Sequence, residues 1–326
     1  MKIQEEAAQT VGKVLETHEI DRVVWVAAGG SNGGHWPANY FMAHESAGIA
    51  SEMYTSAEFA YAPPAYLGER TLAVITSMRG TAETCAAARA ARNCGAATIA
   101  LYVDESKLTQ IADHKIRYES VALDESRAER VNSSIALQLA MALVDQTEGY
   151  ARYGTAMAAF DDVDALYRTA VARAQPRAAA WAERMAAQST IYVMGSGPAY
   201  GAAYIFSICN LEEMLQFDAP TVNSCEFFHG PFEVVDTQKP IFLIMGIGRT
   251  RPCDERARAF LERYGGENVF VLDSRELGLN DLPDDVAEYF NHVILAPVLN
   301  NVFMRALAKA TNKDYLARRY MWKVDY

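Results

Sequence analysis

A pattern of apolar strand, glycine turn and helix occurs twice in this chain, and the repetition constrains the fold more than any other feature. Three apolar runs typical of buried parallel strands lie in the first half, and three similar runs follow in the second. Their starting points pair as Val23 with Ile191, Thr71 with Pro240, and Ala97 with Asn268, at offsets of 168, 169 and 171 residues. Such a nearly constant offset indicates an internal duplication. We therefore expect an α/β protein with two tandem, doubly wound, flavodoxin-like domains, each built on a mostly parallel sheet.

The length and composition agree with two domains. A chain of 326 residues is long enough for two, and its 51% hydrophobic residues suffice for two cores. We place the first domain at residues 1–150 and the second at residues 188–326. Residues 151–187 are rich in Ala and Arg, lack a strand pattern and predict a helical connection between the two.

The charge and the cysteine content narrow the classes of partner. A formal net charge of −11 disfavours nucleic acid and anionic membranes. It also requires any bound phosphate to be held locally, by backbone N–H groups and helix N-termini. The chain begins without the apolar run of a signal peptide, and its 5 cysteines include no pair at metal-ligand spacing. We therefore expect a cytoplasmic protein with reduced thiols and no metal, cofactor, nucleic-acid or membrane partner.

Two turns in the first half carry residues that suit a phosphate. The first strand ends at Gly29, Gly30 and Ser31, and the second ends at the run SMRGT, residues 77–81. Both turns precede helical sequence, a layout in which backbone N–H groups and a helix N-terminus receive a phosphate. Either turn alone is more commonly a tight turn without a ligand, and the dinucleotide fingerprint Gly-x-Gly-x-x-Gly is absent from the glycine run. Because the carboxyl ends of neighbouring parallel strands face one crevice, the two turns together predict a ligand site.

The corresponding turns of the second half are less suited to a phosphate. Residues 195–198 read GSGP, which places a proline where a backbone donor is wanted. The second turn reads GIG at residues 246–248, without the hydroxyls of Ser77 and Thr81. We therefore expect the first half to bind phosphate and its duplicate not to do so.

Two adjacent glutamates interrupt an otherwise apolar segment at residues 200–217. Its apolar residues cover every helix face, as in a buried helix. Glu213 shares a face with Phe206, Cys209 and Phe217 through spacings of three and four residues. A desolvated carboxylate there would suit proton transfer. A glutamate held by a structural hydrogen bond or ion pair is an equal alternative. Because adjacent residues cannot share one face, we expect either Glu213 or its neighbour Glu212 to reach solvent.

The segment SCEFFHGPFE, residues 224–233, concentrates ionisable and aromatic side chains. Glu226, His229 and Glu233 stand among three phenylalanines, and the pair Gly-Pro marks a turn. The mixture predicts a partly buried polar site, in which a histidine and a glutamate titrate near an apolar wall. The alternative is a loop whose phenylalanines anchor it to the core and whose histidine only donates a hydrogen bond.

Over nearly its whole length the sequence resembles the double sugar-isomerase (SIS) domain proteins. The specific matches are EFFHGPFE at residues 226–233 and the closing run RRYMWKVDY at residues 318–326. The glycine and serine turns match the wider superfamily. Within the family the chain is most similar to the deglycases of 6-phosphorylated fructose–amino acid conjugates, namely the fructoselysine and fructose-asparagine 6-phosphate deglycases. The isomerase domain of glucosamine 6-phosphate synthase is a more distant relative.

The resemblance implies three catalytic residues. In the glucosamine 6-phosphate synthase domain a helix glutamate is the proton-transfer base, and a histidine in a His-Gly-Pro motif is associated with opening of the sugar ring. Their spacing of 16 residues falls here on Glu213 and His229. The family's C-terminal lysine falls on Lys323, a candidate to stabilise enolate-like charge. Glu226, three residues before His229, is a further candidate in the site.

The resemblance also implies the phosphate ligands. The family's phosphate residues correspond to Ser31, Ser77 and Thr81, beside Gly29 and Gly30 of the first turn. The second turn departs from the family pattern, because this chain has Arg79 in place of a second serine and one residue fewer before the threonine. A guanidinium there would supply charge in place of a hydroxyl.

The activity that the resemblance implies is deglycation. Proton transfer would convert the conjugate through an enaminol to an imine, which water hydrolyses to a free amino acid and a hexose 6-phosphate. The family implies a homodimer with a shared active site and no cofactor. The sequence leaves open which amino acid is released and whether nitrogen sits on C1, as in an Amadori product, or on C2. Alternatives are an aldose–ketose sugar-phosphate isomerase with the same glutamate and histidine, and a non-catalytic regulator that binds a sugar phosphate.

Overall fold

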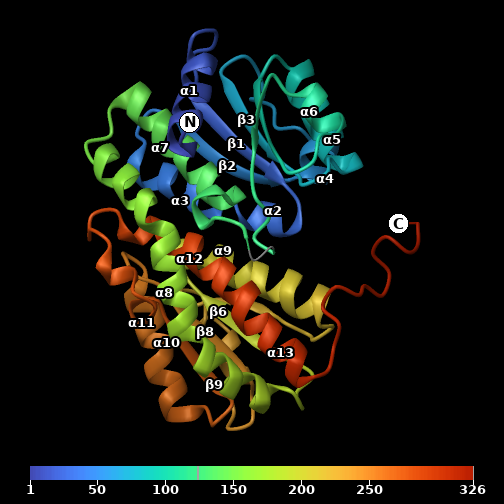
Figure 1. Cartoon of the computed structure of the whole chain (residues 1–326), viewed down its shortest axis with the longest axis vertical. Coiled ribbons are helices and arrows are strands. Elements are labelled where there is room, and N and C mark those ends of the chain that lie inside the picture. Colours follow the sequence, from blue (N-terminus) through green and yellow to red (C-terminus); the bar gives the residue numbers. More distant parts are fainter. Residues whose placement is uncertain (123–124, 326) are drawn as a thin grey trace. The chain divides into compact units, whose positions relative to one another are not determined.

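The computed structural model describes residues 1–122 and 125–325, and the chain forms two compact units, Met1–Val163 and Asp164–Tyr326. Helix α8, Tyr153–Met185, belongs to both units (Figure 1). It covers most of the stretch that we expected to be helical. The finer division, with residues 151–187 as a connection between domains, stays a prediction.

The first unit is built on a parallel sheet of five strands in the order β2-β1-β3-β4-β5. The strands are β1 Arg22–Ala27, β2 Ala50–Thr55, β3 Thr71–Thr76, β4 Ala97–Tyr102 and β5 His114–Arg117. Val24 of β1 pairs with Glu52 of β2 and with Ala73 of β3, so β1 lies inside the sheet. All residues of β3 are buried, as expected of a parallel strand that has helices on both faces.

Helices cover both faces of this sheet. They are α1 Ile3–Leu15, α2 Gly29–Gly33, α3 Trp36–Glu45, α4 Ser56–Tyr61, α5 Ala82–Asn93, α6 Lys107–Ile111, η1 Ala128–Arg130 and α7 Asn132–Glu148. Helix α7 packs against α1 and α3 on one face, and α5 packs against α4 and α6 on the other (Figure 1). On the second face Val24, Val26 and Ile75 share a core with Ala87 and Ala88 of α5. The small alanines let α5 approach the sheet closely.

The second unit repeats the arrangement with a four-stranded parallel sheet in the order β7-β6-β8-β9. Its strands are β6 Tyr192–Gly195, β7 Thr221–Asn223, β8 Ile241–Met245 and β9 Val269–Asp273. An aromatic core supports the sheet, because Trp181 of α8 and Phe242 of β8 pack edge to face with ring centroids 5.2 Å apart. Strands β1, β3 and β4 correspond to β6, β8 and β9 in sheet position. The predicted duplication and the α/β fold class are therefore confirmed.

The helices of the second unit include two π-helical stretches. The elements are α9 Gly197–Ile205, η2 Phe206–Met214, η3 Pro231–Val234, α10 Arg251–Tyr264, α11 Ser274–Leu277, η4 Leu279–Asp281, η5 Ala287–Phe290, α12 Asn291–Val298, η6 Leu299–Met304 and α13 Arg305–Ala310. The elements η2 and η6 are π-helices. The single helix that we expected at residues 200–217 is thus an α-helix that continues as a π-helix and ends at Met214.

One helical run in the second unit, Ala287–Ala310, is long and apolar enough to cross a membrane by length and composition. Its most apolar window has a mean hydropathy of 1.3, and 72% of that window is buried inside the protein. The core helix of a globular unit meets the same criteria. We therefore interpret this run as the core helix of the second unit.

Candidate active site

The first glycine turn joins β1 to α2 and leaves open space above its backbone. Gly29 has a φ of +54°, and a Cβ added there would meet no atom within 4 Å. That positive φ requires glycine, because other residues are strained in this region. Ser31 lies in α2, and its side chain hydrogen-bonds Tyr118, which follows β5. Gly29, Gly30 and Ser31 are thus placed together at the carboxyl end of the sheet.

The second turn of the first unit closes around the hydroxyl of Ser77. Its Oγ accepts hydrogen bonds from the backbone N of Gly80, at 3.1 Å, and of Thr81, at 3.3 Å. Thr81 is the N-cap residue of α5, and its Oγ1 lies 2.8 Å from that of Thr84. The carbonyl of Met78 accepts from the backbone of Asp104, after β4, at 2.9 Å. The turn therefore places two hydroxyls beside the N–H groups at the start of a 12-residue helix, which have no partner within the helix.

Arg79 points toward solvent beside this turn. Its Nε lies 3.2 Å from Oδ2 of Asp104, and the two side chains are 72% and 54% exposed. An ion pair with so much exposure contributes little to stability. The Arg79 side chain is therefore readily released toward an anionic ligand, in line with the charge that the sequence places there.

A buried histidine lies beside the two turns, and it was not among the predicted site residues. His35 is fully buried, and its Nε2 lies 2.6 Å from Oγ1 of Thr76, the last residue of β3. Burial lowers the pKa of His35 to about 3, so the ring is neutral at physiological pH. Its ring centroid lies 5.5 Å from that of Trp25 in β1. The sequence signal was the pair His-Trp directly after the glycine run.

The glycine turns of the second unit are filled by the protein's own side chains. A Cβ on Gly197 would collide with Thr250, and one on Gly248 would collide with Glu288. Ser196 is buried and donates to Oγ1 of Thr250 at 3.0 Å. These contacts leave little room for a phosphate at either turn.

A buried carboxyl lies behind the same turns. Asp254 of α10 is fully buried, and its Oδ2 accepts from the backbone N of Gly246 at 3.2 Å. Burial raises the pKa of Asp254 to about 6, although the hydroxyls of Ser224 and Ser196 and the N–H of Gly246 oppose the shift. The second unit therefore places a carboxyl of its own where a bound anion would find a backbone N–H group.

Glu213, the predicted base, is paired with an arginine from the C-terminal segment. Nε of Arg318 lies 2.7 Å from Oε1 of Glu213, and the two side chains are 8% and 26% exposed. Of the two environments that the sequence left open for Glu213, the ion pair is therefore the one that the structure shows. Glu212 is exposed and accepts from the backbone N of Ala219 at 3.3 Å. The expectation that one of the two glutamates reaches solvent is confirmed.

His229 lies on the surface of the described chain. Both His229 and Glu226 are exposed in a run of turns, where the backbone N of His229 donates to the carbonyl of Glu226 at 2.9 Å. Phe227 is buried, and its ring centroid lies 5.7 Å from that of Phe260 in α10. The expected partial burial of the histidine is therefore wrong, whereas the anchoring of the loop by its phenylalanines is confirmed.

Lys323 belongs to a C-terminal segment that leaves the body of its unit (Figure 1). Lys323 is exposed, and the preceding residue, Trp322, is 73% exposed with a φ of +62°. Nearer the body, Lys313 donates to the carbonyl of Leu215 at the end of the π-helix. Among the described residues, no hydrogen bond or ion pair joins the side chains of Glu213, His229 and Lys323.

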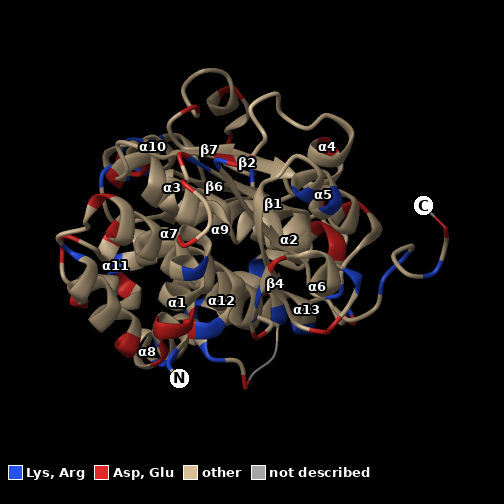
Figure 2. Ribbon diagram, turned by 90° about the horizontal axis from the view of Figure 1, so that it is seen from above, with Lys and Arg blue, Asp and Glu red and all other residues tan. Residues whose placement is uncertain are grey.

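Charged residues of both signs occur throughout the described chain. Figure 2 shows acidic and basic segments interleaved along the chain in both units. Within residues 1–122 and 125–325, no group of three or more His, Cys, Asp or Glu side chains is placed to hold a metal ion. The cysteines of this part of the chain are free thiols.

The chain is similar in sequence and in structure to several known proteins. No family model matches the chain. Fructosamine deglycase FrlB of Bacillus subtilis is 35% identical over 314 residues, which are 96% of this chain and 94% of that protein. A fructoselysine 6-phosphate deglycase of Escherichia coli O157:H7 is 23% identical and covers 81% of the chain and 76% of its own length. A crystal structure from Salmonella typhimurium LT2, classed among the phosphosugar isomerases, is 39% identical with a TM-score of 0.97 and covers 100% of this chain and 98% of its own.

Proposed function

The chain belongs to the fructosamine deglycase family of double SIS domain proteins, and from this premise we propose that it cleaves a 6-phosphorylated sugar–amino acid conjugate to a hexose 6-phosphate and a free amino acid. The observation that carries the proposal is the 35% identity to a fructosamine deglycase over 96% of the chain. A match of that extent includes both units, so it covers the two turns of the first unit and the glutamate and histidine of the second.

The phosphate would bind at the two turns of the first unit. Gly29, Gly30 and Ser31 border the open space of the first turn, and the turn at residues 77–81 offers backbone N–H groups at the start of α5. These groups supply the local donors that a chain of net charge −11 needs to hold a phosphate. Arg79 adds a positive charge once it leaves Asp104.

Glu213 would act as the general base. Its ion pair with Arg318 supports this role, because the guanidinium, 2.7 Å away, holds the carboxylate in one position. Glu213 would remove the proton from the carbon that bears nitrogen and return it to the adjacent carbon, so that the enaminol becomes an imine. Water then adds to the imine carbon and the amine leaves. Proton transfer of this kind contributes roughly 10²–10⁴-fold to the rate.

His229 and Lys323 would complete the site across a homodimer. Both are exposed, and among the described residues neither forms a hydrogen bond or ion pair with the side chain of Glu213, whose partner is Arg318. We therefore assign His229 to sugar-ring opening in the site of the partner, with Glu226 beside it, and Lys323 to the charge of the enolate-like intermediate. Mixing inactive Glu213→Gln and His229→Asn proteins should restore about a quarter of wild-type activity through mixed dimers. A monomer by light scattering with full activity would contradict the shared site.

The proposal is tested with a panel of glycated amino acid 6-phosphates. The purified protein is incubated with each conjugate, and both the released amine and the hexose phosphate are identified. We expect release of the amine in stoichiometric amounts, and the identity of the hexose phosphate reports whether nitrogen was on C1 or C2. Interconversion of sugar phosphates without release of an amine would favour the isomerase instead. The predicted cytoplasmic location is tested separately by cell fractionation.

A further inference from the structure

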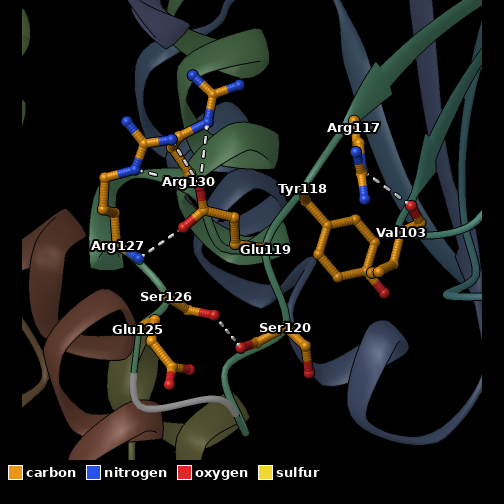
Figure 3. Close-up of a pocket in the computed structure, with 9 residues that line it drawn as sticks. All are labelled: Val103, Arg117, Tyr118, Glu119, Ser120, Glu125, Ser126, Arg127 and Arg130. Atoms are coloured by element: carbon orange, nitrogen blue, oxygen red, sulfur yellow. Dashed lines mark hydrogen bonds and ion pairs between the residues drawn. The ribbon is translucent and has the colours of Figure 1, made fainter.

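A cavity of about 510 Å³ lies in the first unit at the end of its sheet where β4 and β5 finish. Its lining includes Val103, which follows β4, Arg117, the last residue of β5, and Tyr118 and Glu125 beyond it (Figure 3). The size is in the range of cavities that bind small molecules. The roles proposed above for the phosphate turns, Glu213, His229 and Lys323 make no use of these residues.

The cavity is joined to the phosphate turns by direct contacts. Tyr118 lines the cavity and hydrogen-bonds the side chain of Ser31 in the first turn. The backbone N of Val103, also in the lining, donates to the carbonyl of Met78 in the second turn at 3.1 Å. A molecule whose phosphate occupies the turns therefore has a neighbouring cavity within the same unit for another of its parts.

Most of the charge in the cavity wall is already neutralised. Nη2 of Arg127 lies 2.6 Å from Oε1 of Glu119, and Nε of Arg130 lies 3.7 Å from the same atom. Burial alone would raise the pKa of Glu119, but its bonds to Arg127 outweigh that effect and lower it, so the carboxylate is ionised. Arg130 also lies 3.5 Å from Glu6. These side chains are therefore engaged with one another, and we assign them a structural role and not the binding of a ligand.

Arg117 differs from the other cations of the described lining, because it is not engaged in such a network. Its Nε donates to the carbonyl of Val103 at 3.0 Å, which fixes the guanidinium at the cavity (Figure 3). No ion pair of Arg117 with a described residue is formed, so its two terminal amino groups are available to a ligand. Glu125, also exposed, forms no ion pair with the described part of the chain. Among its described lining residues, the cavity thus offers one free cation and one free anion.

We propose that this cavity binds the amino-acid part of the substrate and that Arg117 binds its carboxylate through both terminal amino groups. A guanidinium fork matches a carboxylate in a bidentate manner. Glu119 and Glu125 in the same wall disfavour a second phosphate, whereas an amino acid carries one negative carboxylate and groups that tolerate nearby carboxylates. This inference rests on the proposed deglycase activity, and it identifies the residue that selects amino acids over simple amines.

The test compares two conjugates that differ only in the carboxylate, fructosyl-alanine 6-phosphate and fructosyl-ethylamine 6-phosphate. Wild-type protein should prefer the alanine conjugate at least tenfold in kcat/KM. Arg117→Met should bring the ratio of the two kcat/KM values near one. We expect the KM for the alanine conjugate to rise, and the kcat for the ethylamine conjugate to change little. Lys115→Met is the matched control, because Lys115 lies on the same strand outside the cavity and pairs with exposed Glu105; it should keep the wild-type ratio.

The outcomes separate this inference from the proposed function. Release of amine from neither conjugate by the wild type would overturn the deglycase activity itself. Equal use of both conjugates by the wild type, or an unchanged preference in folded Arg117→Met, would overturn the role of Arg117. Arg117→Lys covers the case in which the Met variant does not fold. It keeps the charge but loses the fork, and we expect an intermediate ratio; a full wild-type ratio would contradict bidentate binding.

Discussion

The two units carry glycine turns in the same sheet positions, but the turn after the first strand is open in the first unit and filled in the second. Gly29 and Gly197 both have positive φ, of +54° and +48°, so the first turn of each unit uses a glycine in the left-handed region. A Cβ on Gly29 would meet nothing within 4 Å, whereas one on Gly197 would collide with Thr250. Both units therefore keep a glycine with positive φ in this turn, and the side chains around it decide whether a ligand fits.

The groups behind the turns differ in charge as well as in size. In the first unit Thr84 hydrogen-bonds both Thr81 and Ser56, so neutral hydroxyls lie at the start of α5. In the second unit Asp254 lies at the start of α10 and accepts from Gly246. A buried carboxyl repels a phosphate and itself takes the backbone donor that a phosphate would use. The second unit is therefore built to hold its own anion, and we assign it the catalytic residues instead.

The largest effect that we predict is on turnover, and it comes from Glu213, the proposed base in the second unit. Glu213→Gln keeps the shape and can still accept from Arg318, but it removes the proton acceptor. Turnover should fall at least about a hundredfold with KM close to normal, because acid–base catalysis acts on the transition state. Steady-state kinetics and solvent-deuterium incorporation at the sugar carbon measure the loss.

The matched control for that variant is its neighbour. Glu212→Gln alters an exposed carboxylate of the same π-helix and should leave turnover within about threefold of wild type. A thermal melt shows that both variants fold. If Glu213→Gln retained turnover within a fewfold, Glu213 would be structural and Glu226 would become the next candidate for the base.

A smaller effect is expected on the free energy of unfolding. It comes from Asp254, which accepts a hydrogen bond from Gly246 in the second turn of the second unit. The pKa of Asp254 is raised to about 6 from a usual value of 3.8. The folded protein therefore binds more protons than the unfolded chain between these values, and this contribution to stability, complete below pH 3.8, is lost as the pH rises through 6. Asp254→Asn removes that dependence and should raise the free energy of unfolding at pH 8 by about 1–2 kcal/mol.

Urea unfolding at pH 5 and pH 8 measures this difference. The gain from Asp254→Asn should be larger at pH 8 than at pH 5, because the wild-type carboxyl is mostly protonated at the lower pH. Glu255→Gln, which alters a half-exposed carboxylate in the next position of α10, should show no such pattern. A variant Asp254→Asn that is equally destabilised at both pH values would mean that the ionised carboxylate is a stabilising group in this turn.

The fold was predictable because its signals are local. The buried strands are continuous apolar runs, and the turns between strand and helix are marked by glycines with positive φ such as Gly29 and Gly197. The π-helix at Phe206–Met214 was not predicted. It changes which residues share a face, so the environment of Glu213 that we inferred from α-helical spacings of three and four residues does not apply. The actual partner, Arg318, lies 105 residues away in the sequence.

The contents of the turns were only partly predictable. The sequence showed that the second unit has Gly246 where the first has Ser77, and that it carries Pro198 in its first turn, but it did not show which groups fill the space. Thr250 and Asp254 come from the cap and first turn of α10, and Glu288 comes from a distant 3₁₀-helix. The exposure of His229 was equally hidden, because a loop of alternating aromatic and polar residues does not specify which side chains face outward.

The assignment of the phosphate to the first unit is decided by comparing Ser77→Ala with Ser196→Ala on a phosphorylated conjugate and on the same conjugate without its phosphate. We predict that wild-type protein strongly prefers the phosphorylated form in kcat/KM. Ser77→Ala should reduce that preference roughly tenfold, since its hydroxyl organises the N–H groups of the turn, whereas Ser196→Ala should leave it unchanged. Equal losses in the two variants, or a loss confined to Ser196→Ala, would contradict this assignment.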